Sequence, residues 1–440
     1  MPAATRPRYG GVLIVQTAAA LRSPEPAAPE DSFTEKMNGL VYETLVKLDP
    51  SGKPQPGLAR SWEEEDGGRR WRIRLPPGVI CHDGSELTAE IVAASLSSAN
   101  SDWEIRAEGN AVVIRTARPS PDVPADLAQP RQAIVLRRAD GTPAGTDPFR
   151  LTQWEPGRTT VLECHEAYRE GRPFLDGVTI QLGREVKDRL MDLEPGRAGL
   201  VELRPDEVRR AIQRGFTIWS SAPLVLMALV FQGGRPAAGD PRLREALALS
   251  IDRAAIHAVL LQKQGEPAWA LLPHWMTGYA FLFSKSRDLG RARGLAGALP
   301  ATSKQLTLAC NIADPLARAV ADRVALNARD AGLAVRVVAE HAAADLRLAE
   351  VRLGAHSPAE ALSGIVRALR LSEQPQLPAD SLESLHAAEA AFVRDFRVIP
   401  LFHVPELYAV SPQVKTRGVP GVLPSGQWRF EDVWLEAPKP

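Results

Sequence analysis

Apolar residues along the first 45 positions change from a continuous run to a helical repeat. The run VLIVQ at residues 12–16 predicts a buried strand, and the Ala- and Pro-rich stretch at residues 18–29 predicts a loop. From residue 33 onward, apolar side chains recur every three or four positions, which predicts a helix with Asp31 or Ser32 as its N-cap. The chain is therefore expected to start as strand, loop and helix.

Alternating residues between positions 46 and 147 indicate short antiparallel strands. The segment WRIRL at residues 71–75 places apolar side chains on one face and arginines on the other. A Glu-Gly-Asn turn separates WEIRA from VVIRT and favours a hairpin. His82-Asp83-Gly84 is interpreted as a further turn, held by the aspartate side chain. This region is expected to be a small, mostly β unit.

The later half of the chain alternates strands with longer helices. An Asp-Pro pair at residues 240–241 starts one helix, and a second Asp-Pro pair at residues 314–315 starts another. The second helix lies between the strands LTLAC and AVRVV, which makes a βαβ unit with parallel strands. A last helix over residues 380–395 leads into the strand VIPLF at residues 398–402. The predicted fold class is α/β with mixed sheets.

Charge and composition exclude two classes of protein. The formal net charge is zero, because 53 Lys and Arg residues balance 53 Asp and Glu residues. Without a basic excess or a basic stripe, no nucleic-acid partner is expected. No run of about 18 apolar residues is present, so no membrane span is expected. The start MPAATRPRYGGVLIV lacks the apolar core of a secretory signal and a cysteine for a lipid anchor, so the protein is either cytoplasmic or begins after a removed export segment.

The residue types that carry chemistry form no catalytic or metal-binding pattern. There is no GxSxG elbow, P-loop, HExxH or GxGxxG after a strand, so neither an enzymatic activity nor a cofactor is expected. The cysteines at positions 81, 164 and 310 are far apart and are expected to be small buried residues. In both Cys-His pairs, neighbouring side chains on a strand point to opposite faces, so neither pair chelates one ion and no metal site is expected.

Five stretches carry a resemblance to a known family. They are GLVYETLVKLDPSGKPQPGLARSW, WRIRLPPGVICHDGSELTAEIV, GTDPFRLTQWEPGRTTVLECHEAYREGRPFLDGVTIQL, DPRLREALALSIDRAAI and RVIPLFH. In this order they resemble solute-binding protein family 5, which binds dipeptides, oligopeptides, nickel complexes and some sugars for ABC importers. The resemblance covers Gly10 to about Leu435. It implies a two-lobed periplasmic-binding-protein-like fold (type II, cluster C) with an extra small β-rich subdomain.

This family plan divides the chain into five segments. The expected segments are residues 1–45 (first part of lobe I), 46–147 (the small β-rich insert), 148–234 (second part of lobe I), 235–404 (lobe II) and 405–440 (return to lobe I).

The sequence differs from the family's pattern in segments that bear on ligand binding. The family's Gly-Thr-Gly-Pro-Tyr reads GTDPF here, and a Phe-Asn pair before the second lobe reads Phe231-Gln232. Peptide binders carry acids in a second-lobe segment that corresponds to residues 352–358, and this segment has no carboxylate here. Free peptides are therefore not expected to be tight ligands.

Ligand contacts are expected mainly from two loops. In the family, the loop that corresponds to residues 19–33 faces the ligand. Trp269 and Trp275 lie in an irregular stretch after the second-lobe helices, where aromatic residues often line clefts, although a core position is the alternative. His356 would donate a hydrogen bond, unless its shortened loop does not reach the cleft. The expected ligand-binding residues are Ser23, Ser32, Phe33, Gln232, Trp269, Trp275 and His356.

The resemblance implies a receptor rather than an enzyme. The expected function is a periplasmic or extracytoplasmic, monomeric solute-binding protein that closes two lobes around a small ligand. The ligand would be peptide-like, a sugar or a metal chelate, and the permease subunits of an ABC importer would be the partners. The alternative is a cytoplasmic or regulatory ligand-sensing domain without a transport role. An export signal upstream, or neighbouring permease genes, would favour the receptor.

Overall fold

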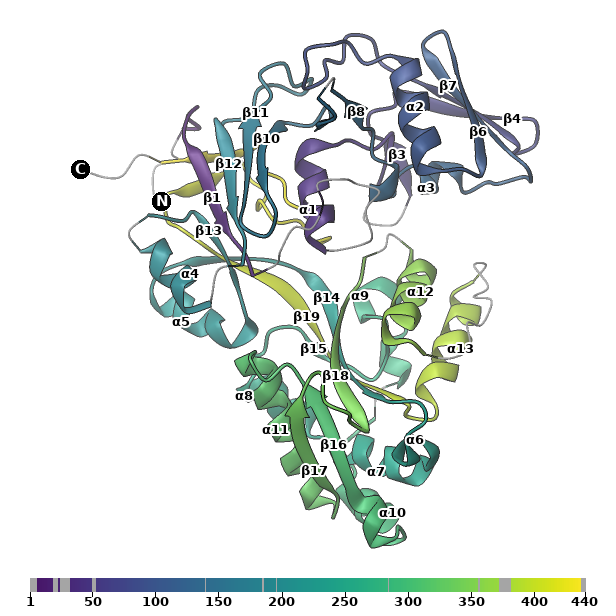
Figure 1. The fold of residues 1–440 in the computed structure, drawn as a ribbon, viewed down its shortest axis with the longest axis vertical. Coiled ribbons are helices and arrows are strands. Elements are labelled where there is room, and N and C mark those ends of the chain that lie inside the picture. Colours follow the sequence, from purple (N-terminus) through teal and green to yellow (C-terminus); the bar gives the residue numbers. More distant parts are fainter. Residues whose placement is uncertain are drawn as a thin grey trace. The chain divides into compact units, whose positions relative to one another are not determined.

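The chain folds into two compact units, each of which is described by itself. The structure, a computed structural model, describes residues 6–18, 23, 32–49, 53–138, 140–183, 186–194, 196–283, 285–354, 357–371 and 381–436. Unit 1 comprises residues 1–202, 211–220 and 408–440, and unit 2 comprises residues 203–210 and 221–407. Figure 1 labels the elements of both units.

The main sheet of unit 1 mixes antiparallel and parallel strands. Its strand order is β10 (Phe149–Glu155), β11 (Thr159–Cys164), β12 (Gly177–Gln181), β1 (Val12–Gln16), β13 (Leu200–Leu203) and the end of β19 (Val398–Val410). β1 runs parallel to both β12 and β13, so the carboxyl ends of these three strands lie at one edge. The expected strand at residues 12–16 is confirmed.

Helix α1 (Ser32–Val41) supplies one side of the core of unit 1. Its residues Met37 and Leu40 are fully buried and share a cluster with Leu13, Trp428 and Phe430. The remaining elements of unit 1 outside the β-rich part are α4 (Val186–Leu193), the end of α5 (Val208–Gln213), β20 (Val414–Thr416) and β21 (Val433–Leu435). Helix α1 starts where the sequence pattern predicts, because the apolar repeat matches the period of a helix with one buried face.

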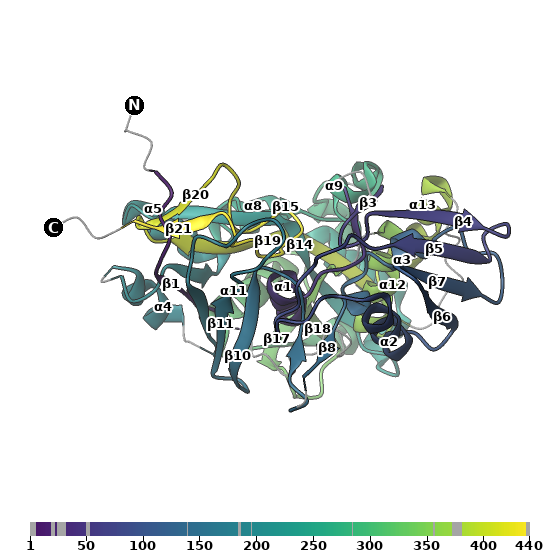
Figure 2. The same cartoon turned by 90° about the horizontal axis from the view of Figure 1, so that it is seen from above.

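The β-rich part of unit 1 has its own sheet and its own core. The sheet order is β4 (Ser61–Glu65), β5 (Arg70–Arg74), β7 (Ala111–Thr116) and β6 (Trp103–Glu108), as Figure 2 shows, with α2 (Ala89–Ala99) packed against β6 and β7. The predicted hairpin is confirmed, with Gly109 at φ +64° in its turn. Smaller elements complete it: β2 (Val46–Leu48), β3 (Pro54–Pro56), α3 (Val123–Asp126), η1 (Pro130–Gln132), β8 (Leu136–Arg137) and β9 (Pro143–Ala144).

Unit 2 contains the predicted βαβ arrangement. β16 (Gln305–Cys310) pairs in parallel with β17 (Ala334–Ala339) and β18 (Leu346–Arg352), and β18 pairs antiparallel with β14 (Thr217–Phe231). The helices and short elements are α6 (Pro236–Gly239), α7 (Pro241–Ser250), α8 (Arg253–Val259), β15 (Glu266–Pro267), α9 (His274–Thr277), η3 (Ala280–Phe283), α10 (Leu289–Gly297), η4 (Ala301–Lys304), α11 (Pro315–Asp330), α12 (Pro358–Leu369) and α13 (Leu382–Val393). The capping interpretations are confirmed, because Asp240 accepts a hydrogen bond from the backbone of α7 and Asp314 from that of α11.

Two long strands differ from the sequence expectation. β19 continues to Val410, eight residues beyond the predicted end at residue 402, and β14 is 15 residues long. Two of the four borders between the units fall inside these strands, at Ser220–Ser221 and Leu407–Tyr408, and the segment borders expected at residues 234 and 404 stay a prediction. β19 is buried along most of its length, but Pro405 and Glu406 inside it are residue types that a sequence pattern reads as the end of a strand.

A buried polar network fixes the start of the GTDPF segment in unit 1. Gly145 donates its N–H to His82 Nδ1 (3.1 Å), and its carbonyl accepts from the His82 backbone (2.9 Å). Thr146 Oγ1 donates to Glu43 Oε2 (2.9 Å), and Arg169 Nη2 pairs with Glu43 Oε1 (2.7 Å). The His82-Asp83-Gly84 turn is held as predicted, because the Asp83 carboxylate accepts from both the backbone and the hydroxyl of Ser85.

We predict that Gly145→Ala destabilises unit 1. A Cβ at this position would lie 2.0 Å from the carbonyl oxygen of Val41 and 2.8 Å from the ring of Tyr42, so backbone would have to move. The expected loss is about 2–3 kcal/mol of unfolding free energy, measured by urea denaturation. Gly233→Ala is the matched control, because a Cβ there meets nothing within 4 Å. Equal stability of the two variants would show that the close approach at Gly145 relaxes without cost.

Candidate functional site

The carboxyl ends of the parallel strands in unit 1 carry a group of polar side chains. In α/β sheets, ligands bind at this edge. Gln16, at the end of β1, donates from Nε2 to Gln181 Oε1 and to Asp192 Oδ2, both at 2.8 Å. Thr17 Oγ1 donates to Glu202 Oε2 (2.6 Å), and the N–H of Ala18 donates to the same oxygen (2.7 Å). We call Gln16, Thr17, Gln181, Arg189 and Glu202 the strand-end cluster.

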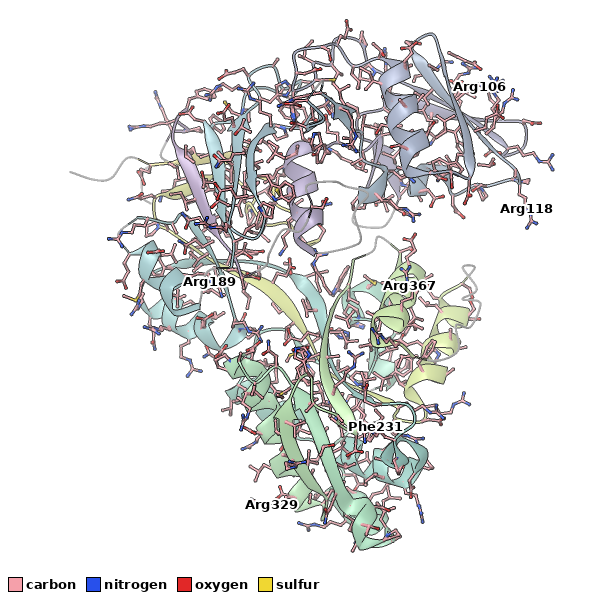
Figure 3. The ribbon with its side chains drawn as sticks, in the orientation of Figure 1. Arg106, Arg118, Arg189, Phe231, Arg329 and Arg367 are labelled. Atoms are coloured by element: carbon pink, nitrogen blue, oxygen red, sulfur yellow. The ribbon has the colours of Figure 1, made fainter. Side chains whose placement is uncertain are left out.

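Two buried cations balance the carboxylate of this cluster. Arg189, on α4 (Figure 3), is 1% exposed and lies 3.5 Å from Glu202 Oε2. Lys36 donates to Tyr408 Oη (2.8 Å) and lies over the rings of Tyr408 and Trp428. Burial alone would raise the pKa of Glu202, but the charge of Lys36 and the Thr17 hydroxyl outweigh it and lower that pKa. The Glu202 carboxylate therefore stays ionised. Its hydrogen bonds with Thr17 and Ala18 fix the start of the loop that follows β1.

The unit 1 residues expected to contact the ligand are only partly described. Ser23 is half-buried. Ser32 and Phe33 form the first turn of α1, but the placement of their side chains, like most of the loop between β1 and α1, lies outside the described residues. Their role as ligand contacts stays a prediction.

Unit 2 contains a cavity of about 480 Å³ at the second expected loop. Its walls come from β15, the loop after it, α9, η3 and β19. The residues around it are Glu266, Pro267, Ala268, Trp269, Ala270, His274, Ala280, Phe281 and His403. We call this cavity the Trp269 pocket. It combines two aromatic rings with one carboxylate and two imidazoles, a composition typical of a small-molecule site.

A buried arginine supports the wall formed by Trp269. The Arg253 guanidinium lies 3.5 Å from the centre of the Trp269 ring, and it donates to the carbonyl oxygens of Ala268 (3.0 Å) and Pro400 (2.8 Å). Burial lowers the pKa of Arg253 to about 9, so the group remains protonated at neutral pH. The indole thus rests on a fixed cation, which holds it in one orientation.

The peptide group between Leu271 and Leu272 is held on both sides by buried ionisable side chains. Glu389 Oε1, on α13, accepts from the N–H of Leu271 (2.6 Å) and of Leu272 (2.8 Å). His403 Nε2 lies 2.9 Å from the carbonyl oxygen of Leu271. Burial raises the pKa of Glu389 to about 7 and lowers that of His403 to about 4. These contacts fix the loop between Trp269 and His274.

The remaining expected residues lie apart from the pocket. Trp275 is half exposed, does not line the cavity, and donates from Nε1 to the carbonyl of Pro223 (3.1 Å). Gln232 follows Phe231, the last residue of β14 (Figure 3), and its side chain donates to the carbonyl of Val230 (3.1 Å). His356 lies outside the described residues. Of the residues in unit 2 expected to contact a ligand, Trp269 alone is among those that line this pocket.

Sequence reasoning missed most of the pocket. Glu266, His274, Phe281 and His403 were not singled out, although His403 ends the RVIPLFH stretch that carries part of the resemblance. The signal in the sequence was His403 itself, because it is a polar residue in an apolar run that forms a buried strand. Among the described residues, no three His, Cys, Asp or Glu side chains converge as metal ligands. Cys81 and Cys310 are buried as expected, whereas Cys164 is only partly buried.

The fold is that of a type II periplasmic binding protein. The ABC transporter substrate-binding protein CtaP from Listeria monocytogenes superposes with a TM-score of 0.79 at 17% sequence identity, over 97% of this chain and 100% of that chain. AppA from Bacillus subtilis, solved in complex with a nonapeptide, superposes with a TM-score of 0.78 at 17% identity, over 98% and 100% of the two chains. The fold class expected from the sequence is confirmed.

The sequence comparison defines the family. Residues 53–355 match the family described as "Bacterial extracellular solute-binding proteins, family 5 Middle", and the chain belongs to it. The oligopeptide-binding protein AppA of Bacillus subtilis is 23% identical over 295 residues, or 60% of this chain and 54% of AppA. The nickel-binding protein NikA of Staphylococcus aureus is 26% identical over 241 residues, or 51% and 49%. The chain spans about half the length of these curated relatives.

We predict that Glu389 makes stability depend on pH. Burial raises the pKa of Glu389 from an ordinary 4.5 to about 7, so between these values the native state holds a proton that the unfolded state releases. The contribution of Glu389 to stability is therefore full below pH 4.5 and is lost as the pH rises through 7, by about 3 kcal/mol. Relative to Glu389→Gln, the wild type should lose stability across this window in chemical denaturation.

The difference between the two proteins is the quantity to measure. His403, whose pKa lies below its ordinary value, changes stability in the opposite sense over part of this range, in both proteins. Glu383→Gln, an exposed acid on the same helix, is the control and should leave the pH profile unchanged. Parallel curves for wild type and Glu389→Gln would mean that Glu389 has an ordinary pKa in the folded state.

Proposed function

We propose that this protein is the solute receptor of an ABC importer. It captures a small ligand outside the cytoplasm and delivers it to the permease subunits, without catalysing a reaction. The observation that carries the proposal is membership of a family of extracellular solute-binding proteins, together with a fold shared over nearly the whole chain with a substrate-binding protein of an ABC transporter. Among the described residues, no helix has both the length and the apolar character needed to cross a bilayer.

The names of the relatives narrow the class of ligand. They include an oligopeptide-binding, a nickel-binding and a glutathione-binding protein, and the solved structures contain a nonapeptide, Ni(L-His)2 and mannopinic acid. We therefore propose a polar, charged small solute as the ligand of this protein. The Trp269 pocket supports this proposal, because its aromatic and ionisable lining suits a ligand with both apolar and charged parts.

We propose the Trp269 pocket and the strand-end cluster as ligand-contact regions. Each lies in one unit and each is held by buried charges, so the contacting atoms are in place before the ligand arrives. Preorganisation of this kind raises affinity, because fewer side chains lose freedom on binding. A ligand-sensing domain without a transport role would use the same contacts, and neighbouring permease genes would distinguish the receptor from it.

We predict that a solute from a panel of peptides, nickel–amino acid complexes, opines and sugars stabilises the protein. At about 100 times its dissociation constant, the ligand adds about 2.7 kcal/mol, or about 3 °C in Tm for a chain of this length. Differential scanning fluorimetry measures the shift, and calorimetry follows for each hit. A complete absence of shifts across the panel would contradict the receptor proposal.

Two tryptophan variants locate the binding region in unit 2. Trp269→Ala removes a wall of the pocket and should weaken binding of the hit about tenfold or more, because a large aromatic contact is lost. Trp275→Ala truncates an aromatic residue of α9 that does not line the pocket, and it should leave the affinity within about threefold. Loss of binding in Trp275→Ala alone would place the contact outside the pocket.

A further inference from the structure

The hydrogen-bond partner of His403 determines which of its ring nitrogens carries the proton. Nε2 lies 2.9 Å from the carbonyl oxygen of Leu271, which can only accept, so Nε2 must donate. Burial keeps the ring neutral at physiological pH. Nδ1 therefore carries a lone pair and no proton. The His403 side chain is 2% exposed, and it lines the Trp269 pocket.

The nearest charged atom to this nitrogen is also an acceptor. Glu266 Oε1 lies 3.9 Å from His403 Nδ1, too far for a hydrogen bond. The same oxygen accepts only a long contact of 3.3 Å from the backbone N–H of His274. Two acceptors thus converge on one part of the pocket, and no described side chain donates a hydrogen bond to either atom.

A donor with two hydrogens fits between the two acceptors. A nitrogen placed about 2.9 Å from both atoms would see them about 85° apart. This is about 25° narrower than the angle between two N–H bonds of a tetrahedral ammonium, so each hydrogen bond would bend by only about 12° and stay within the usual range. A carboxylate or phosphate at the same point would face two lone pairs and no donor, which is repulsive. The site therefore discriminates by charge as well as by hydrogen bonding.

The rest of the lining suits the organic part of an amine. The side chains of Pro267, Ala270 and Ala280 are apolar, and Phe281 presents a ring that is 62% exposed. Arg253 is the one cation that the structure places against this wall, and the indole of Trp269 separates it from the cavity. The carboxylate of Glu266 borders the cavity directly, so its field acts on a bound group at shorter range than that of Arg253.

We propose that the Trp269 pocket binds the protonated primary amine of a solute, with the ammonium between Glu266 and Nδ1 of His403 and the carbon skeleton against Phe281 and Trp269. This inference rests on the proposed function, and it names the chemical group that the pocket recognises. It also supplies a carboxylate in unit 2 at a position other than the acid-free segment at residues 352–358.

The test uses small probes that differ in one group. 2-Phenylethylamine, 2-phenylethanol and phenylacetate are titrated into the full chain by ligand-detected NMR and calorimetry, with 2-phenylethylguanidine as a guanidinium probe. The amine should bind at least about tenfold more tightly than the alcohol, and phenylacetate should not bind. Equal binding of amine and alcohol, or tighter binding of the carboxylate, would overturn the proposal. Preference for 2-phenylethylguanidine over the amine would overturn the assignment to a primary amine.

Variants then test the two acceptors. Glu266→Gln should weaken binding of 2-phenylethylamine about tenfold or more while leaving Tm nearly unchanged, because Glu266 is partly exposed. His403→Gln keeps a donor for the carbonyl of Leu271 but removes the Nδ1 acceptor, and it should weaken the amine by a similar factor. Glu383→Gln is the matched control. Unchanged amine affinity in Glu266→Gln would mean only adventitious binding of the aromatic ring and would sink the proposal.

The two proposals fail in different ways. If a solute from the panel binds Glu266→Gln as tightly as the wild type, the receptor function stands and the amine site is wrong. If 2-phenylethylamine binds in a Glu266-dependent way but no panel solute shifts Tm, the amine site stands and the receptor proposal is contradicted. Both results come from the same preparation of folded protein, whose Tm is the common reference.

Discussion

Buried polar groups in the loops of this protein must find partners, and ionisable side chains supply them. In unit 2, the backbone N–H of Leu271 donates to Glu389 and the carbonyl oxygen of Leu271 accepts from His403. These two side chains lie 118 and 132 positions away in the chain. An unpaired buried peptide group costs about 1–3 kcal/mol, so this double contact decides where the loop lies. The positions of Trp269 and His274, and with them the pocket, follow from that contact.

The same constraint operates in unit 1 with a different set of side chains. The backbone and hydroxyl at the end of β1 donate to Glu202, whose charge is balanced by buried cations. In both loops, backbone N–H groups are thus held by an acidic side chain and not by apolar packing alone. If these two regions contact the ligand as proposed, their polar atoms are already oriented, which lowers the entropic cost of capture.

Local structure could be read from the sequence where a single residue has one physical role. Asp240 and Asp314 cap helices, and Gly109 turns a hairpin, because in each case the preference is local and strong. The family order of five stretches then extended these local elements to a fold. The full lengths of β14 and β19 escaped prediction, because prolines lie inside both strands and a proline in a sequence favours the end or the edge of a strand.

The candidate site was harder to predict, because its residues are far apart in the sequence. Trp269 could be proposed from its place in an irregular stretch, but Glu266 and His403 become neighbours only when β15 pairs with β19. That pairing also fixes the tautomer of His403, because it brings the ring next to the carbonyl of Leu271. The presence of two hydrogen-bond acceptors in the pocket therefore depends on the tertiary structure. A histidine and a glutamate far apart in a sequence are compatible with a donor, a metal ligand or an ordinary surface pair. In this fold, the Leu271 carbonyl accepts the hydrogen bond that His403 donates from Nε2, so Nδ1 keeps its lone pair 3.9 Å from the Glu266 carboxylate, and the proposed ammonium would donate to both.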